Sequence, residues 1–76
     1  MNNDKETIIE KLEFFLKNKI KIHITKTNRE FLNGFLVKKI SSDVFVINEV
    51  VRGELHVFAS EIFNIEEYMK KEEERK

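Results

Sequence analysis

The chain has 76 residues, with 14 basic and 14 acidic side chains and neither cysteine nor proline. A chain of this length forms one domain, and without cysteine it has no disulfide and no thiolate metal site. The charge balance excludes the basic excess of strong non-specific nucleic-acid binders, and no apolar run approaches the roughly 20 residues of a membrane-spanning helix. With no signal-peptide pattern at its start, we expect a cytoplasmic protein with no membrane partner.

The first predicted element is an amphipathic helix over residues 4–18. Its apolar residues recur at helical spacing, and Asp4 is suited to cap the N-terminus. The apolar stripe consists of Ile8, Ile9, Leu12, Phe15 and Leu16. Because the opposite face is polar, the helix is expected to lie on a surface with one side against the core.

Short strands follow between residues 20 and 65, where the hydrophobic period changes to two. They are placed at 20–25, about 31–40, 44–47 (or onward to 51), 55–60 and 61–65, the last after a helical turn or kink. In the second strand Leu32, Leu36 and Ile40 are expected to share a face with Gly34, while Phe31, Phe35 and Val37 take the other. The third is apolar on both faces, which predicts cover on both.

Gly34 lies in the middle of the second predicted strand, where glycine destabilises unless the backbone bends or is closely approached. A sharply curved strand in a small barrel is such a place. We therefore predict a mostly β chain with one N-terminal α-helix, in which residues 1–65 form a single domain. Residues 66–76 are expected to be a charged tail, either a frayed helix or disordered.

Three short motifs lie in the strand region: Asn28 with Phe31-Leu32-Asn33-Gly34, then Asp43-Val44-Phe45-Val46-Ile47, then Val57-Phe58-Ala59-Ser60-Glu61-Ile62. In this order, over residues 5–65, the chain resembles the Sm-like (LSm/Hfq-type) superfamily. The resemblance implies a small, strongly bent five-stranded Sm-like (SH3-like) barrel. It also implies a cyclic homo-oligomer in which the fourth and fifth strands of neighbours pair. Such pairing would satisfy the backbone groups that an open seam leaves unpaired.

The resemblance further implies RNA binding by two loops at the inner rim of the ring. Phe45 takes the position of the family's stacking aromatic, and Asp43 that of its loop aspartate. The second loop departs from the family, because Ala59-Ser60 replaces a Lys-His pair and Phe58 a tyrosine. The candidate nucleic-acid-binding residues are Asp43, Phe45, Ser60, Lys38, Lys39 and Arg29, with Lys26 beside them in a basic rim. For Phe45 a core role is the favoured alternative, and for the basic residues a solvated strand end or turn.

Nothing in the sequence favours an enzyme, since there is no phosphate-binding glycine loop, nucleophile elbow or metal-binding helix. No cofactor or metal is expected, and His23 and His56 are interpreted as exposed strand residues.

The leading hypothesis is a non-catalytic, ring-forming Sm-like protein that binds single-stranded RNA, in the manner of an RNA chaperone. The alternative is a structural or protein-interaction module that kept the ring and lost the RNA site, favoured by the neutral charge and by Ala59-Ser60. A third hypothesis, a phage or mobile-element accessory protein, comes from the small size and the Lys, Asn, Ile and Phe usage.

Overall fold

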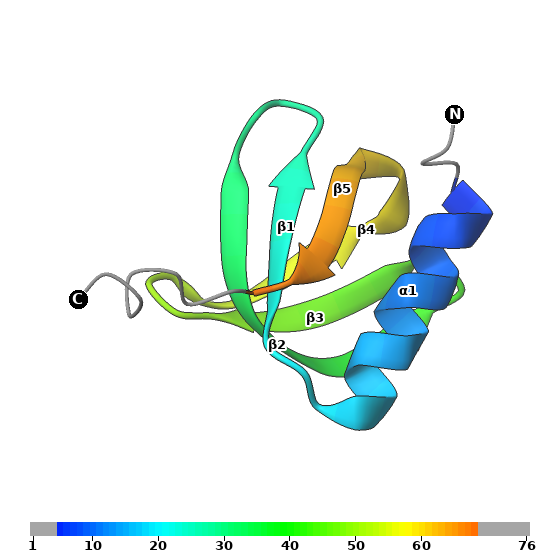
Figure 1. Cartoon of the computed structure of the whole chain (residues 1–76), viewed down its shortest axis with the longest axis horizontal. Helices are drawn as coiled ribbons and strands as arrows, with labels where there is room; N and C mark the ends of the chain where they lie inside the picture. The colour runs from blue at the N-terminus through cyan, green and yellow to red at the C-terminus, as the bar shows by residue number, and fades with distance from the viewer. Residues whose placement is uncertain (1–4, 69–76) are drawn as a thin grey trace.

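A computed structural model describes residues 5–68, which form one α-helix, five β-strands and a turn of 3-10 helix (Figure 1). In chain order these are α1 (Lys5–Asn18), β1 (Ile22–Lys26), β2 (Phe31–Ser41), β3 (Val44–Glu49), β4 (Gly53–Phe58), η1 (Ala59–Glu61) and β5 (Ile62–Glu67). The prediction of a mostly β chain with one N-terminal helix is confirmed. The expected cap at Asp4 and residues 69–76 of the expected tail lie outside the described residues.

The five strands form one bent antiparallel sheet in the order β4-β3-β2-β1-β5. Strand β5 returns to lie beside β1, with Ile65 opposite Ile24. Within residues 5–68 no pairing joins β4 to β5, so the sheet is open (Figure 1). The five strands of the predicted small barrel bend around the core, but they do not close it, and β4 and β5 remain as free edges.

The hydrophobic core lies between one side of the sheet and α1. The helix contributes Ile8 and Leu12, whose spacing of four residues puts both on one helical face, as the periodicity predicts. The core consists of Ile8, Leu12, Ile22, Ile24, Leu32, Leu36, Phe45, Ile47, Val57, Ala59, Ile62 and Ile65. The helix ends where Lys19 adopts a φ of 54° and the Ile20 N–H donates to the Phe15 carbonyl at 3.1 Å.

Strand β2 explains both the central glycine and one failed expectation. A methyl group at Gly34 would lie 2.1 Å from the carbonyl oxygen of Asn48, so only glycine permits this approach of β2 to β3. Beyond Leu36 the β2–β3 register shifts twice, which leaves Val37 and Ile40 without paired partners. Ile40 is therefore half exposed instead of sharing the buried face of Leu36, because the bulge at Val37 reverses the alternation before Ile40 is reached.

The remaining boundaries differ by a few residues from those expected. Phe45, Val46 and Ile47 are all buried, which confirms that β3 is covered on both faces. Strand β4 begins at Gly53, at a φ of 83°, and ends before Ala59, so the predicted end of this strand at 60 belongs to η1. Strand β5 continues to Glu67, beyond the expected boundary at 65.

Candidate nucleic-acid interface

The residues expected at an inner rim are held by the core and by α1. Phe45 is 0% exposed, which agrees with its core interpretation and leaves no ring face for a base in this chain. Asp43 forms an ion pair with Lys5 at 3.4 Å. Lys39 forms an ion pair with Glu13 of α1, and its Nζ lies 5.7 Å from the centre of the Phe45 ring. These charges tie the β2–β3 hairpin to the helix.

The other predicted residues fall in three places. Ser60 is exposed in η1, and the Ala59 N–H donates to the Asp43 carbonyl at 2.9 Å, so the structure brings Ser60 near Asp43. Lys38 is exposed on β2, across from Val46 on β3. Arg29 lies in the β1–β2 loop and belongs to a different group of residues. The six candidates therefore do not form one site.

The side of the sheet that faces away from the core carries a row of polar and aromatic residues. In an antiparallel pair, directly opposite residues point to the same face. Thr25 pairs with Phe31 and His23 with Asn33, and Phe35 follows two residues later. We call His23, Thr25, Phe31, Asn33 and Phe35 the aromatic face. Their neighbours Ile24, Leu32 and Leu36 are buried, so this face points outward.

His23 is fixed within the aromatic face. Its ring stacks on Phe31, with centroids 5.4 Å apart and planes inclined by 24°. Its Nδ1 lies 2.6 Å from the Asn33 Oδ1, a hydrogen bond in which Nδ1–H is the donor when the amide oxygen faces the ring. The His23 ring therefore packs against one face of the Phe31 ring, and Phe31 remains 55% exposed.

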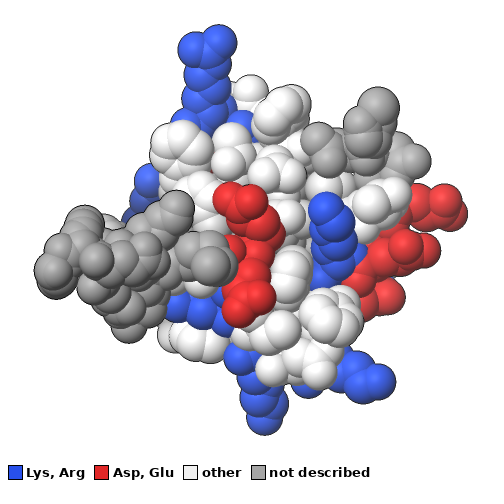
Figure 2. Space-filling model, viewed as in Figure 1, with Lys and Arg blue, Asp and Glu red and all other residues white. Residues whose placement is uncertain are grey.

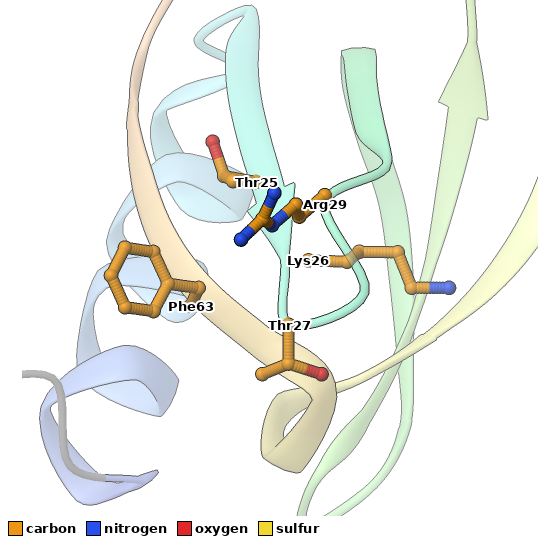
Figure 3. Close-up of a pocket in the computed structure, with 5 residues that line it drawn as sticks. All are labelled: Thr25, Lys26, Thr27, Arg29 and Phe63. Atoms are coloured by element: carbon orange, nitrogen blue, oxygen red, sulfur yellow. The ribbon is translucent and has the colours of Figure 1, made fainter.

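A shallow pocket of about 290 Å³ adjoins the aromatic face at Thr25. Thr25, Lys26, Thr27, Arg29 and Phe63 line it. Figure 3 shows the Arg29 guanidinium turned toward the side of the loop on which Phe63 lies, while the Lys26 side chain extends the opposite way. The pocket thus combines an exposed aromatic ring, a guanidinium and two threonine hydroxyl groups.

Two irregularities of the backbone meet in this pocket. Thr25 pairs with Asn64 and Lys26 with Ile62, so Phe63 is the extra residue of a β-bulge. Arg29 has a φ of 74°, which costs a non-glycine residue about 1–2 kcal/mol. Two hydrogen bonds fix this turn: the Arg29 N–H donates to the Lys26 carbonyl at 2.9 Å, and the Glu30 N–H donates to the Asn28 Oδ1 at 3.0 Å. Both features re-aim a side chain, as bulges and strained residues at functional sites do.

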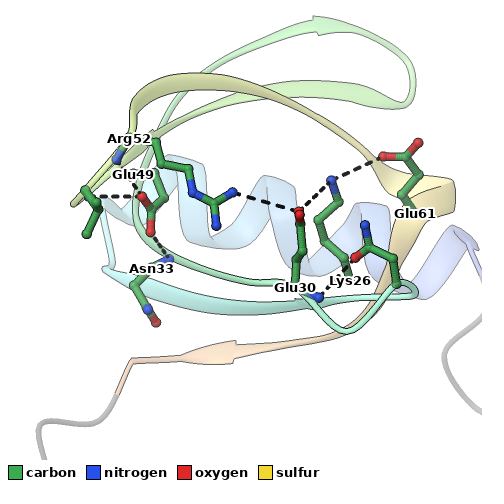
Figure 4. A network of polar contacts seen from close by, with 8 residues as sticks. Lys26, Glu30, Asn33, Glu49, Arg52 and Glu61 are labelled. Carbon is green, nitrogen blue, oxygen red and sulfur yellow. Dashed lines mark hydrogen bonds and ion pairs between the residues drawn. The ribbon is translucent and has the colours of Figure 1, made fainter.

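Charged residues beside the pocket compensate one another. Lys26 lies between Glu30 at 3.7 Å and Glu61 at 3.6 Å, and Arg52 reaches Glu30 at 3.8 Å (Figure 4). This network links the β1–β2 loop to η1 and to the β3–β4 turn. Within residues 5–68 no ion pair involves Arg29, so its charge is available to a ligand.

Glu49 fixes the β3–β4 turn and the backbone of Asn33. Its carboxylate is 6% exposed and accepts hydrogen bonds from the N–H groups of Arg52 (2.8 Å), Val51 (3.0 Å) and Asn33 (3.2 Å) (Figure 4). The Arg52 N–H contributes most to lowering the pKa of this carboxyl group. Burial opposes that shift, and the other two N–H groups and the Arg52 charge add to it. The carboxylate therefore stays charged and holds three donors.

The surface is otherwise of mixed charge. Figure 2 shows basic and acidic side chains in separate small groups with uncharged surface between them, and no broad basic area on this face. Among the described residues no group of His, Cys, Asp or Glu could hold a metal ion, and no helix is long and apolar enough to cross a membrane.

Sequence reasoning placed Phe31 and Phe35 on the face of β2 opposite Leu32 and Leu36, and Phe63 in the fifth strand, but it treated none of the three as a binding residue. The sequence signal for these aromatic residues was their alternation with leucines and isoleucines, which are buried. The bulge at Phe63 and the φ of Arg29 gave no signal in the sequence. No protein-family model matches this chain, and no curated protein matches it significantly. Its function must be argued from the site.

Proposed function

We propose that this chain is a non-catalytic, cytoplasmic Sm-like protein that assembles through β4 and β5 and binds single-stranded RNA on its aromatic face. The observation that carries the proposal is the exposure of Phe31 (55%) and Phe35 (46%) on the aromatic face and of Phe63 (58%) beside it. Every base has a flat face, and stacking on an aromatic side chain contributes about 1–3 kcal/mol per base. A surface of this kind binds single strands with little dependence on sequence.

The balance of charge supports stacking over phosphate binding as the main source of affinity. Lys26 and Lys39, two of the basic residues near the strands, are committed to carboxylates. Affinity that comes from many phosphate contacts falls steeply with salt, whereas stacking does not. We therefore expect RNA binding that weakens only moderately between 50 and 200 mM salt, because few counterions are released.

The two free edges support assembly. Strands β4 and β5 each present an unpaired row of backbone groups, and they are the strands through which Sm-like subunits pair. Because the two edges belong to different strands, pairing is head-to-tail and closes into a ring when the rotation between copies allows it. A ring repeats the aromatic face in every copy, so modest contacts combine into a tighter complex.

Titration of fluorescent oligo(U) and oligo(A) against the full chain at about 50 and 200 mM salt tests the RNA function. Phe35→Ala should weaken binding about fivefold or more, as expected for the loss of one stacked base. Phe14→Ala is the matched control, because Phe14 is 56% exposed but lies on α1, across the core from the aromatic face. Absence of binding at both salt concentrations would refute the RNA function.

Light scattering tests the assembly separately. A monomer mass at micromolar concentration would contradict pairing through β4 and β5.

One observation favours a second candidate function, a protein-interaction module that kept the ring without RNA binding. The inner-rim positions are occupied by a buried Phe45 and by Asp43 and Lys39, which α1 holds in ion pairs. An oligomer that binds neither oligonucleotide would support this candidate.

A further inference from the structure

We propose that the pocket between Arg29 and Phe63 binds the phosphorylated end of a single-stranded RNA, with the end base on Phe63 and the terminal phosphate on Arg29. The inference rests on the proposed function, since it assigns one end of the bound strand. The chemical class is a phosphomonoester attached to a nucleotide.

The pocket lies at the β5 end of the aromatic face of each chain. Thr25 belongs both to the aromatic face and to the pocket lining, so a strand lying over Phe35 and Phe31 reaches Phe63 next. Phe63 lies on β5, which is an edge of the sheet. Within one chain the stacking surface stops there. The pocket volume of about 290 Å³ is at the lower limit for small-ligand pockets, which suits one nucleotide.

Charge on the far side of the loop does not attract a strand that continues past the pocket. Glu30 and Glu61 flank Lys26 there, and both carboxylates are about half exposed. Their negative charge is compensated by Lys26 and Arg52, which leaves no net attraction for a further phosphate. On the pocket side, Arg29 is the cation without an ion pair among residues 5–68.

A single guanidinium group favours a terminal phosphate over a bridging one. A phosphomonoester carries about 1.5 to 2 negative charges and three acceptor oxygens, whereas a phosphodiester carries one charge. Guanidinium binds such a group through two parallel hydrogen bonds. Arg29 has a φ of 74°, at which glycine would be unstrained, and strained residues of this kind cluster at functional sites.

The test measures the ratio of affinities for phosphorylated and hydroxyl-ended oligo(U), with the fluorophore on the opposite end. Oligonucleotides with a 5′-phosphate and with a 3′-phosphate are both used, against the full chain. We expect one of them to bind about tenfold or more tightly than its hydroxyl-ended form, as charge-assisted bidentate bonds predict. Equal affinity of all forms would overturn the inference, while the proposed RNA function would stand on the hydroxyl-ended binding.

Variants assign the effect to Arg29. Arg29→Gln should abolish the preference for the phosphate, since it removes the charge-assisted contact. Lys38→Gln is the matched control, because Lys38 is exposed on β2 and makes no ion pair within residues 5–68. A preference that survives Arg29→Gln, or one that Lys38→Gln abolishes equally, would refute the assignment.

Arg29→Gly separates the side chain from the backbone. Glycine adopts the φ of Arg29 without strain, so this variant should have a higher Tm and still lose the phosphate preference. A glycine variant that keeps the preference would overturn the proposal.

A competition arm distinguishes the end of a strand from a free nucleotide. If uridine monophosphate displaces the phosphorylated oligonucleotide at a concentration near the Kd of that oligonucleotide, the pocket is a mononucleotide site and end recognition is wrong. Failure of every oligonucleotide to bind would refute this inference together with the proposed function.

Discussion

Strand β2 carries large hydrophobic residues on both of its sides, and the two sides have opposite surroundings. Leu32 and Leu36, each two positions from Gly34, are buried against the core, whereas the neighbouring Phe31 and Phe35 remain about half exposed. Full burial of a phenylalanine would contribute about 1.5–3 kcal/mol, and the outward rings forgo much of that. The core side is therefore optimised for folding, while the outward side holds apolar surface available to a partner.

The largest expected difference between the two sides is in the cost of removing a ring. Phe45→Ala should lower the free energy of unfolding by about 3–5 kcal/mol, because Phe45 is fully buried and its loss leaves a cavity. Phe35→Ala should change it by about 0.5 kcal/mol or less, as at other surface positions. Urea unfolding of both variants measures the difference. Equal destabilisation would mean that the outward ring is part of the packed structure and not free for binding.

The second comparison is between the two glycines: lack of space requires glycine at position 34, and the backbone conformation favours it at position 53. Gly34→Ala should destabilise by about 3 kcal/mol, the upper part of the range for overpacking, because its methyl group meets the Asn48 carbonyl. Gly53→Ala is the control: no atom lies within 4 Å of its added methyl group, and only the φ of 83° is strained, at about 1–2 kcal/mol. Thermal unfolding of both variants would show whether Gly34→Ala is indeed the costlier substitution. The opposite order would contradict the tight approach of β2 to β3.

Substitution of Glu49 should have the smallest of the three effects on stability, and this effect should depend on pH. Glu49→Gln should cost about 1–3 kcal/mol at pH 7, because an amide offers one acceptor oxygen to three N–H donors. The folded-state pKa of Glu49 lies below its ordinary value of 4.5, so its contribution is complete above that pH and is lost as the pH falls through the folded-state pKa.

Unfolding measured from pH 7 to pH 3 tests this. The loss of stability below about pH 4.5 should be smaller in Glu49→Gln than in the parent chain. Glu54→Gln, at an exposed position of β4, is the control and should keep the parent profile. A Glu49→Gln profile that matches the parent would show that other carboxyl groups produce the acid response.

The fold was predictable from the sequence where local periodicity and packing agree. Ile8 with Leu12, and Ile22 with Ile24, repeat at helical and strand spacing, and all four are buried. The role of Gly34 was predictable because a glycine inside a strand indicates either a bend of the backbone or a close approach to it. The predictions failed where one residue is inserted into a strand: the bulges at Val37 and Ile40 turned Ile40 outward, and nothing in the local sequence marks a bulge.

The candidate site was less predictable, because it depends on contacts between distant residues. For Phe45 the sequence favoured a core role over base stacking, and its full burial agrees with that role. The pairing of Lys39 with Glu13, 26 residues away, compensates the charge of a predicted basic group, and no periodicity carries that information. Arg29 was identified from its charge alone, while its aromatic neighbour Phe63 came from another strand through a register shift. Open edges likewise become visible only when the strand order is known.

Because Glu49 accepts hydrogen bonds from the β3–β4 turn, a residue of this turn can have an exposed side chain and a protected backbone amide. Val51 is 84% exposed at the tip of the β3–β4 turn, yet its N–H and that of Arg52 donate to a nearly buried carboxylate. The amide hydrogens of these two residues should exchange only when their hydrogen bonds to the carboxylate break. Their exchange should therefore be far slower than that of turn amides without a hydrogen bond. The most exposed apolar tip of the described chain is thus also a rigid one, which presents its valines in a single, preorganised position.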